Sequence, residues 1–297
     1  MIRTPAILIL ITFVLQAVSY EFQRKAGNIL GKTTFRIFLV INGCLAPLLI
    51  GTAIGTFFTG SEFTINKTAV ASINSPVISQ WSNEWHGLEA VAEPFNVEFG
   101  LMIMFLAICL GAMYMINNIA DSTLAYRLRR CLMFCFCCFL TMFLIVITQL
   151  MTMDGFAVNA DGNIYRETHK YMHNLLQMPI VLIIFLTGVL LLLTSITISL
   201  IKSSFRRGIW FGGLGSILSV MAVFMIAGYN NTSYYPSTAD MQSSLTIANS
   251  CSSEFTLRVM AIVSLIIPFV VAYIAYFWHK MDKQSLTSEE LNRSEKY

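Results

Sequence analysis

Long apolar runs alternate with shorter polar connections along almost the whole chain. There are about seven such runs, and most reach the length of about 20 residues that a helix needs to cross a bilayer. The runs are Ala6–Tyr20, Phe35–Phe58, Phe99–Ala120, Cys131–Met153, Met178–Ile201, Ile209–Ala227 and Leu257–Trp278. The pattern predicts an all-α integral membrane protein, with about seven transmembrane helices in one bundle over residues 1–281 and a polar cytoplasmic tail over residues 282–297.

The overall composition supports the membrane class independently of any motif. Apolar residues make up 56% of the 297 residues, charged residues make up 12%, and the mean hydropathy is +0.68. A soluble domain carries about 25% charged residues. The chain therefore does not have the composition of a soluble enzyme or binding domain.

The Lys and Arg residues predict which ends of the helices face the cytoplasm. Fourteen of the 19 fall on one alternate set of connections and on the C-terminal tail, and five fall on the other set. The basic connections are Glu21–Thr34, with Arg36 just beyond it, Asp121–Arg130 and Lys202–Arg207. By the positive-inside rule these connections are cytoplasmic, which gives an N-out, C-in topology. The net charge of +3 then marks the cytoplasmic face and implies no nucleic-acid partner.

The first apolar run has an alternative interpretation. Arg3, the apolar stretch from Ala6 to Leu15 and the residues Ala17-Val18-Ser19 also fit a cleaved secretory signal peptide. Cleavage there would leave the basic connection Glu21–Thr34 outside the membrane, against the charge rule. A retained first helix is therefore favoured.

The polar segment Gly228–Met260 has a distinctive order of residues and carries no Lys or Arg before Arg258. Its many hydroxyl and amide side chains can satisfy one another, which predicts an ordered cap over the helix bundle. The pattern is Tyr235-Pro236-Ser237-Thr238, Ser244-Leu245-Thr246-Ile247, Asn249-Ser250, Ser252-Ser253, Thr256-Leu257 and Met260. It resembles the last extracytoplasmic loop and final helix of subunit II of the cytochrome bd quinol oxidases, in the version closest to the Bacteroidetes-type branch. Shorter resemblances follow in order at Gly51–Gly60, Trp85–Leu88, Pro94–Val97 and Asp154–Val158.

The resemblance extends to the N-terminal region. Ser19–Asn28 looks like the cytoplasmic end of the family's third helix and the loop after it. The family has about nine spans, so we expect this chain to lack the first two, by truncation, a wrongly chosen start or a split product. Family members are thought to route protons partly through acidic and Trp positions on those two helices, so no proton-path residue is carried over to this chain.

The resemblance implies a respiratory function at the bacterial inner membrane. In this family the complex oxidises quinol and reduces dioxygen to water, and subunit I holds two b-type haems and one d-type haem. Subunit II pairs with subunit I and generally binds no haem, so we expect a non-catalytic subunit that is inactive alone. The expected partners are the haem-bearing subunit I, membrane lipid and quinone. The resemblance leaves open which quinone is used and whether a small accessory subunit is attached.

The histidines agree with a haem-free chain. A membrane haem needs an axial ligand that faces the bundle interior, whereas His86, His169, His173 and His279 lie in loops or at span ends. His169 and His173 have the i, i+4 spacing of a metal-binding pair, but no third ligand accompanies them. We therefore predict no catalytic, cofactor-binding or metal-binding residue on this chain.

The remaining candidate groups favour structural interpretations. The cysteines of the run Cys135-Phe136-Cys137-Cys138 lack the spacing of iron–sulfur ligands, and no disulfide is predicted. Glu98, at a span start, is interpreted as an interfacial carboxylate in preference to a proton-path residue. The spacings Gly51-x-x-x-Gly55 and Gly208-x-x-x-Gly212 predict close helix contacts, either within the chain or with subunit I.

Two hypotheses compete with that of an oxidase subunit. A secondary transporter would show two related halves and polar groups at mid-membrane, and the sequence shows neither. The other is a non-functional remnant that has lost its first two helices.

Overall fold

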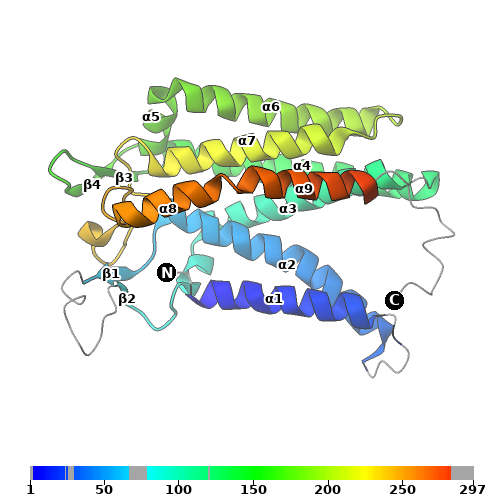
Figure 1. Ribbon diagram of the computed structural model, residues 1–297, viewed down its shortest axis with the longest axis horizontal. Coiled ribbons are helices and arrows are strands. Elements are labelled where there is room, and N and C mark those ends of the chain that lie inside the picture. The colour runs from blue at the N-terminus through cyan, green and yellow to red at the C-terminus, as the bar shows by residue number, and fades with distance from the viewer. Residues whose placement is uncertain (1–2, 24, 26–29, 67–78, 120, 282–297) are drawn as a thin grey trace.

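The computed structural model describes residues 3–23, 25, 30–66, 79–119 and 121–281 (Figure 1). The tail predicted for residues 282–297 lies outside this part of the chain. The α-helices are α1 (Arg3–Phe22), α2 (Gly31–Thr59), α3 (Pro94–Asn118), α4 (Ser122–Thr152), α5 (Lys170–Gln177), α6 (Pro179–Ile201), α7 (Gly208–Gly228), α8 (Glu254–Ser264) and α9 (Ile267–Met281). Two antiparallel strand pairs are β1 (Phe63–Ile65) with β2 (Ser79–Trp81), and β3 (Gly155–Val158) with β4 (Ile164–Glu167). Short 3₁₀ helices are η2 (Leu88–Val91) and η3 (Met241–Ser243).

The predicted apolar runs all form helices, which confirms the all-α integral membrane class. Within the described ranges, six helical segments are long and apolar enough to cross a membrane. They are Gly31–Thr59, Pro94–Asn118, Ser122–Thr152, Pro179–Ile201, Gly208–Gly228 and Glu254–Met281. The first run forms α1, whose apolar part Ala6–Phe22 is shorter.

The start of α4 differs from the prediction. The segment Asp121–Arg130 was expected to be a connection, but the helix already begins at Ser122. The cause is a helix cap: one carboxylate oxygen of Asp121 accepts hydrogen bonds from the backbone N–H groups of Thr123 and Leu124, at 2.7 and 3.2 Å. The basic residues of this segment therefore stand on a rigid extension of α4.

The two ends of the molecule differ in chemistry. The strand pairs and the polar segment 229–253 lie at one end of the helices (Figure 1). The C-terminal ends of α1, α3, α6 and α9 and the first turns of α2, α4 and α7 lie at the other end. This separation agrees with the N-out, C-in topology, which stays a prediction from the charges.

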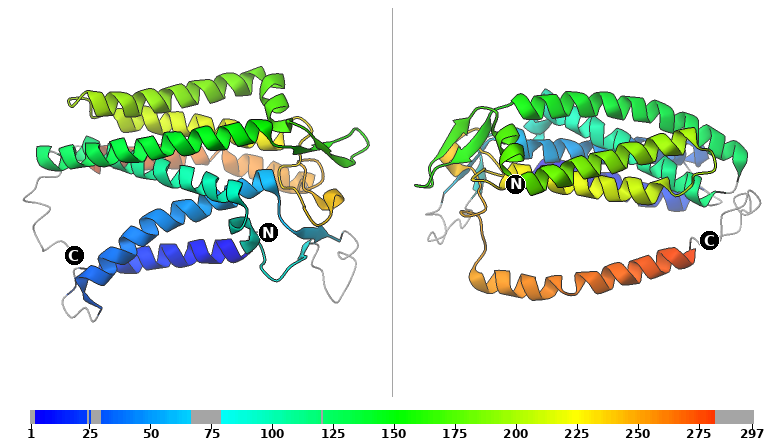
Figure 2. Two further views of the ribbon diagram at one scale, coloured as in Figure 1. Left: turned by 180° about the vertical axis from the view of Figure 1, so that it is seen from behind. Right: turned by 90° about the horizontal axis from the view of Figure 1, so that it is seen from above.

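The final span stands apart from the other helices. Its helix is interrupted at Leu265 and Ile266, and α9 resumes with Pro268 as its second residue, where the missing N–H costs no hydrogen bond. No residue of α8 or α9 is buried. The view from above shows this span lying away from the bundle (Figure 2), so its apolar surface is available to lipid or to another chain.

An aromatic cluster packs the bundle at the end that carries the strands. The rings of Phe58, Phe95, Phe99 and Tyr171 lie with centroids 5.0–6.2 Å apart. Tyr171 is fully buried, and its hydroxyl donates to the carbonyl oxygen of Phe58 at 3.2 Å. Burial raises the pKa of Tyr171, which keeps this hydroxyl neutral and able to donate. The short helix α5 is thereby fixed to the end of α2.

Glycines bring α2 into backbone contact with α3. A Cβ atom placed on Gly51 would lie 2.7 Å from the Cα atom of Gly100. A Cβ atom on Gly55 would lie 2.8 Å from the Cα atom of Asn96. The Gly51-x-x-x-Gly55 spacing therefore serves packing within the chain.

Glycines also bring α6 into backbone contact with α7. A Cβ atom on Gly188 would lie 2.7 Å from the backbone nitrogen of Ser219, and Gly215 meets the backbone of α6. Gly208 and Gly212 face serine side chains of α6. The second predicted spacing is therefore also internal.

Replacing Gly215 with valine is expected to destabilise the α6–α7 pair. A Cβ atom there would lie 2.6 Å from the backbone nitrogen of Leu192 and 2.7 Å from the carbonyl oxygen of Gly188, so the helices would have to separate. Overpacking of this kind costs about 1–3 kcal/mol. Thermal unfolding in detergent, followed with a thiol-reactive fluorophore, measures the loss. Gly213→Val is the matched control, because a Cβ atom there meets nothing within 4 Å; an equal loss in both variants would contradict the close contact.

Candidate functional site

The polar cap predicted from Gly228–Met260 is ordered and is tied to several other elements. Tyr235 and Ser61 share a hydroxyl–hydroxyl hydrogen bond of 3.0 Å, and the backbone N–H of Ile65 donates to the hydroxyl of Ser243 at 3.0 Å. Ser237 donates to the carbonyl oxygen of Phe63. These bonds fasten the cap to β1 and to the end of α2.

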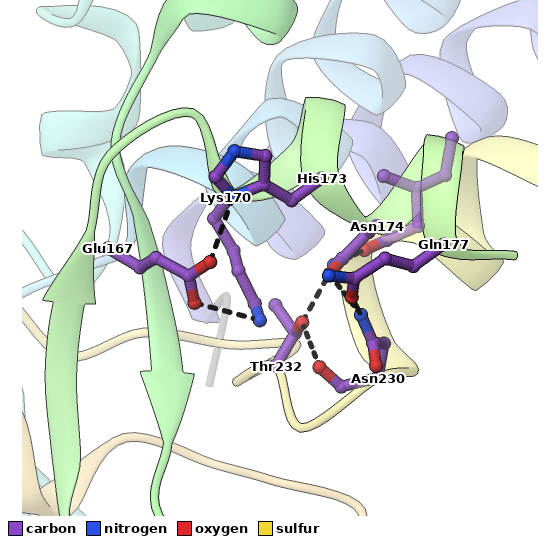
Figure 3. Close-up of polar contacts among 8 residues, drawn as sticks. Glu167, Lys170, His173, Asn174, Gln177, Asn230 and Thr232 are labelled. Carbon is purple, nitrogen blue, oxygen red and sulfur yellow. Dashed lines mark hydrogen bonds and ion pairs between the residues drawn. The ribbon is translucent and has the colours of Figure 1, made fainter.

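Asn174 is the central polar residue beneath this cap (Figure 3). It has no exposed surface, and its amide nitrogen donates to the carbonyl oxygen of Ile226 at 2.8 Å and to the hydroxyl of Thr232 at 2.7 Å. Its amide oxygen accepts from Asn230 at 3.0 Å, and Asn230 also donates to Gln177 at 2.6 Å. Asn174 therefore joins α5, the last turn of α7 and the start of the cap.

A charged cluster lies beside this amide network (Figure 3). The Nζ atom of Lys170 and the Nδ1 atom of His173 each lie 3.0 Å from a different carboxylate oxygen of Glu167. The side chain of Lys170 is only 7% exposed, so its charge requires a partner. Glu167 supplies that partner from β4.

The pKa of Glu167 follows from this arrangement. Partial burial alone would raise the pKa, but the hydrogen bonds and positive charges of His173 and Lys170 outweigh it and hold the pKa below its ordinary value of 4.5. Glu167 is therefore ionised at neutral pH and stabilises the link between β4 and α5.

The two histidines at helical spacing do not share a site. His169 precedes α5, and its Nδ1 atom lies 3.2 Å from the carbonyl oxygen of Met151, whereas His173 contacts Glu167. Within the described ranges no group of three or more His, Cys, Asp or Glu residues could hold a metal ion. His86 and His279 lie elsewhere, in the loop before η2 and in the last turn of α9.

Glu98 has a specific partner that the sequence pattern did not reveal. It lies in the second turn of α3 and is partly buried, and the side-chain amide of Gln149 on α4 donates to its carboxylate at 2.6 Å. This bond links two neighbouring helices. The hydrogen bond between Glu98 and Gln149 suits a role in helix packing. Asn96 has a similar role, since it is buried and donates to the carbonyl oxygen of Ala90 at 3.1 Å.

The amide and charge network around α5 was not predicted from the sequence. Lys170, His173, Asn174 and Gln177 recur at helical spacing on a helix of eight residues, and this spacing is a signal of a polar face. Their partners come from β4 and from the segment after α7, at sequence distances of up to 58 residues. No local pattern connects them.

A sequence match to known proteins extends over nearly the whole chain. The family described as cytochrome bd terminal oxidase subunit II matches residues 2–281. The chain belongs to this family. It is 23% identical over 303 residues to the cytochrome bd-I ubiquinol oxidase subunit 2 of Escherichia coli K12, covering 97% of this chain and 75% of the relative. The proteins with the same description from Escherichia coli O6:H1 and O157:H7 match to the same extent.

Membership of the cytochrome bd subunit II family confirms the resemblance seen in the sequence. Together with the membrane-spanning helices it makes the chain a multi-pass inner-membrane protein and part of an oxidoreductase complex. It also favours the oxidase hypothesis over that of a secondary transporter.

The enclosed cavity at the centre of the bundle does not fit the haem that the cytochrome bd family implies. The cavity enclosed by α2, α3, α4, α6 and α7 has a volume of about 70 Å³, and its lining is apolar apart from Ser216 and Ser219. Of the side chains that ligate haem iron, the described lining contains only Met102. A single thioether in so small a space cannot hold a porphyrin.

Replacing Asn174 with leucine is expected to loosen the cap. The change keeps the branched shape of the side chain but leaves the buried Thr232 and the carbonyl oxygen of Ile226 without their donor. Two such losses cost about 2–4 kcal/mol. Chemical denaturation in detergent measures the difference. Gln177→Leu, on the exposed side of the same helix, is the control and should cost less than about 1 kcal/mol; similar losses in both would show that the buried network does not stabilise the cap.

The stability of the chain is expected to fall on acidification in part through Glu167. Because its folded-state pKa is lowered, its contribution is complete above the unfolded value of about 4.5 and is lost as the pH falls through the folded value. Glu167→Gln should be less stable at pH 7 and should lose less stability between pH 5 and pH 3, in melting-temperature measurements. Glu254→Gln changes an exposed pair with Arg258 and should keep the wild-type acid profile; a wild-type profile in Glu167→Gln would refute the assignment.

Proposed function

We propose that this chain is the haem-free subunit of a cytochrome bd-type quinol oxidase and that it supports a haem-bearing subunit I. In this proposal subunit I carries the b-type and d-type haems, oxidises quinol and reduces dioxygen to water. The chain itself is inactive alone. The observation that carries the proposal is the position of the histidines: all four lie at or beyond the ends of the helical spans.

The chemistry of the helix interiors supports this division of work. The bundle centre is filled by apolar side chains around a small cavity. Electron transfer to oxygen needs a redox centre, and no described side-chain set here suits one. The polar networks that the chain does build lie at the end of the bundle, where they fasten loops to helices.

The polar groups on α1 and α2 support contact with another protein. The side-chain amide of Asn42 donates to Gln16 at 2.5 Å, and Gln16 lies on the exposed surface of α1. An amide facing hydrocarbon is costly, so this face suits another helix better than lipid. Subunit I is the partner that the family membership indicates.

Purification of the chain with and without subunit I tests the proposal. The chain alone should show no haem bands in a reduced-minus-oxidised spectrum and no quinol-dependent oxygen uptake, because it supplies no axial ligand in its interior. Co-expression with the subunit I gene from the same source should yield a complex that shows both.

Histidine variants provide the control. His169→Ala and His173→Ala, in the complex, should leave the haem spectrum unchanged because both residues contact only outer-end groups. A haem spectrum in the purified chain alone, lost on replacement of any one histidine, would overturn the proposal.

A further inference from the structure

A groove between α7 and α9 lies at the end of the molecule that carries the basic connections. Its volume is about 760 Å³, which is within the range of about 300–1,000 Å³ usual for binding sites of small organic ligands. The first turn of α7 forms one wall and α9 forms the other. The view from above shows α9 running alongside the bundle, apart from the other helices (Figure 2).

The groove contains a cation that the fold does not use. Arg129 donates to the carbonyl oxygens of Ser199 and Ser203, and Arg206 donates to that of Ile119. The guanidinium of Arg207, by contrast, lines the groove and has no hydrogen bond or ion pair within the described part of the chain. Arg129 and Arg206 therefore hold helices together, whereas the guanidinium of Arg207 faces the groove and is available for a ligand.

His279 completes the polar part of the groove. It lies in the last turn of α9, lines the same space as Arg207, and has no hydrogen-bond partner among the described residues. The segments 202–212 and 267–281, which form the two walls, contain no Asp or Glu. An anion is therefore the ligand that this end of the groove complements.

Apart from Asn117 of α3, whose amide donates to Asn118, the rest of the lining is apolar and aromatic. Trp210 and Phe211 project from α7, and Ile274 and Trp278 from α9. Tryptophan side chains are enriched where the hydrocarbon of a bilayer meets its headgroups. A free inorganic anion would contact only the polar part of this groove, whereas a lipid would fill both parts.

We propose that this groove binds an anionic phospholipid of the cytoplasmic leaflet. The phosphate lies between the guanidinium of Arg207 and the imidazole of His279, the indoles of Trp210 and Trp278 lie at the headgroup level, and the acyl chains run along the space between α7 and α9. Basic pockets between helices on the cytoplasmic side have the charge that anionic lipid headgroups require. The lipid thereby joins the final span to the bundle, since the described residues of this chain bury none of α8 or α9.

Tryptophan quenching by brominated lipid tests the proposal. The full chain is placed in phosphatidylcholine nanodiscs that contain increasing fractions of brominated phosphatidylglycerol. The wild type should be quenched at a lower fraction of brominated phosphatidylglycerol than of brominated phosphatidylcholine. Arg207→Gln should raise the half-saturating fraction about fivefold, the effect of one cation near an anionic surface. Equal quenching by the two lipids, or an unchanged Arg207→Gln, would overturn the proposal.

Matched variants separate binding from folding. Arg127→Gln removes the same charge at the same end of the bundle but outside the groove, and should behave as wild type. Arg207→Lys keeps the charge and should retain most of the affinity. His279→Gln changes α9, where no side chain is buried, and should weaken binding even if Arg207→Gln fails to fold.

Two further arms distinguish the lipid from other occupants. Millimolar inorganic phosphate should leave the quenching unchanged; complete relief would show a simple anion site and would overturn the proposal. The quenching should persist in the complex with subunit I. Its loss there would show that a partner helix fills the groove, which would also overturn the proposal.

Discussion

Every backbone N–H and C=O group of this chain that lies within the bilayer must find its hydrogen-bond partner inside the protein, because hydrocarbon offers none. The membrane-spanning segments are accordingly helical, and the described strands, 3₁₀ turns and irregular segments are confined to the ends of the bundle. The same constraint explains the cap. Where the chain leaves the helices, its polar groups are satisfied by serine, threonine, asparagine and tyrosine side chains, as between Ser61 and Tyr235.

Helix association in such a chain depends on close packing rather than on the hydrophobic effect, because lipid is as apolar as the helix surface. The contacts at Gly51 and at Gly215 show how this is achieved: glycine lets two backbones touch. The final span has no such contact and no buried residue. Its position therefore depends on what surrounds the chain, whether lipid or protein, to a greater degree than that of the other spans.

The sequence predicts the helices of this protein well, because a span needs a continuous apolar run and composition alone reveals it. The boundaries were less predictable: the apolar run of α4 begins at Cys131, but the cap of Asp121 extends the helix to Ser122. The order of residues in Gly228–Met260 was enough to indicate the family. The network around Asn174 was not predictable, since its partners are brought together only by the fold. The environment of Glu98 was likewise hidden, because its partner Gln149 lies 51 residues away on the next helix.

Arg129 combines two functions that are usually assigned to different residues. As one of the basic residues of the α3–α4 region, it contributes to the charge asymmetry that directs how the nascent helices insert. In the folded chain its guanidinium bridges the end of α6 and the turn before α7 through two carbonyl oxygens, at 3.2 and 2.6 Å. Membrane insertion depends only on the charge of the side chain, whereas the two hydrogen bonds of Arg129 need a planar, forked donor. A lysine at this position would preserve the orientation of the protein in the membrane while removing a tie between α4 and the α6–α7 turn, so topology and packing are set by separable properties of one side chain.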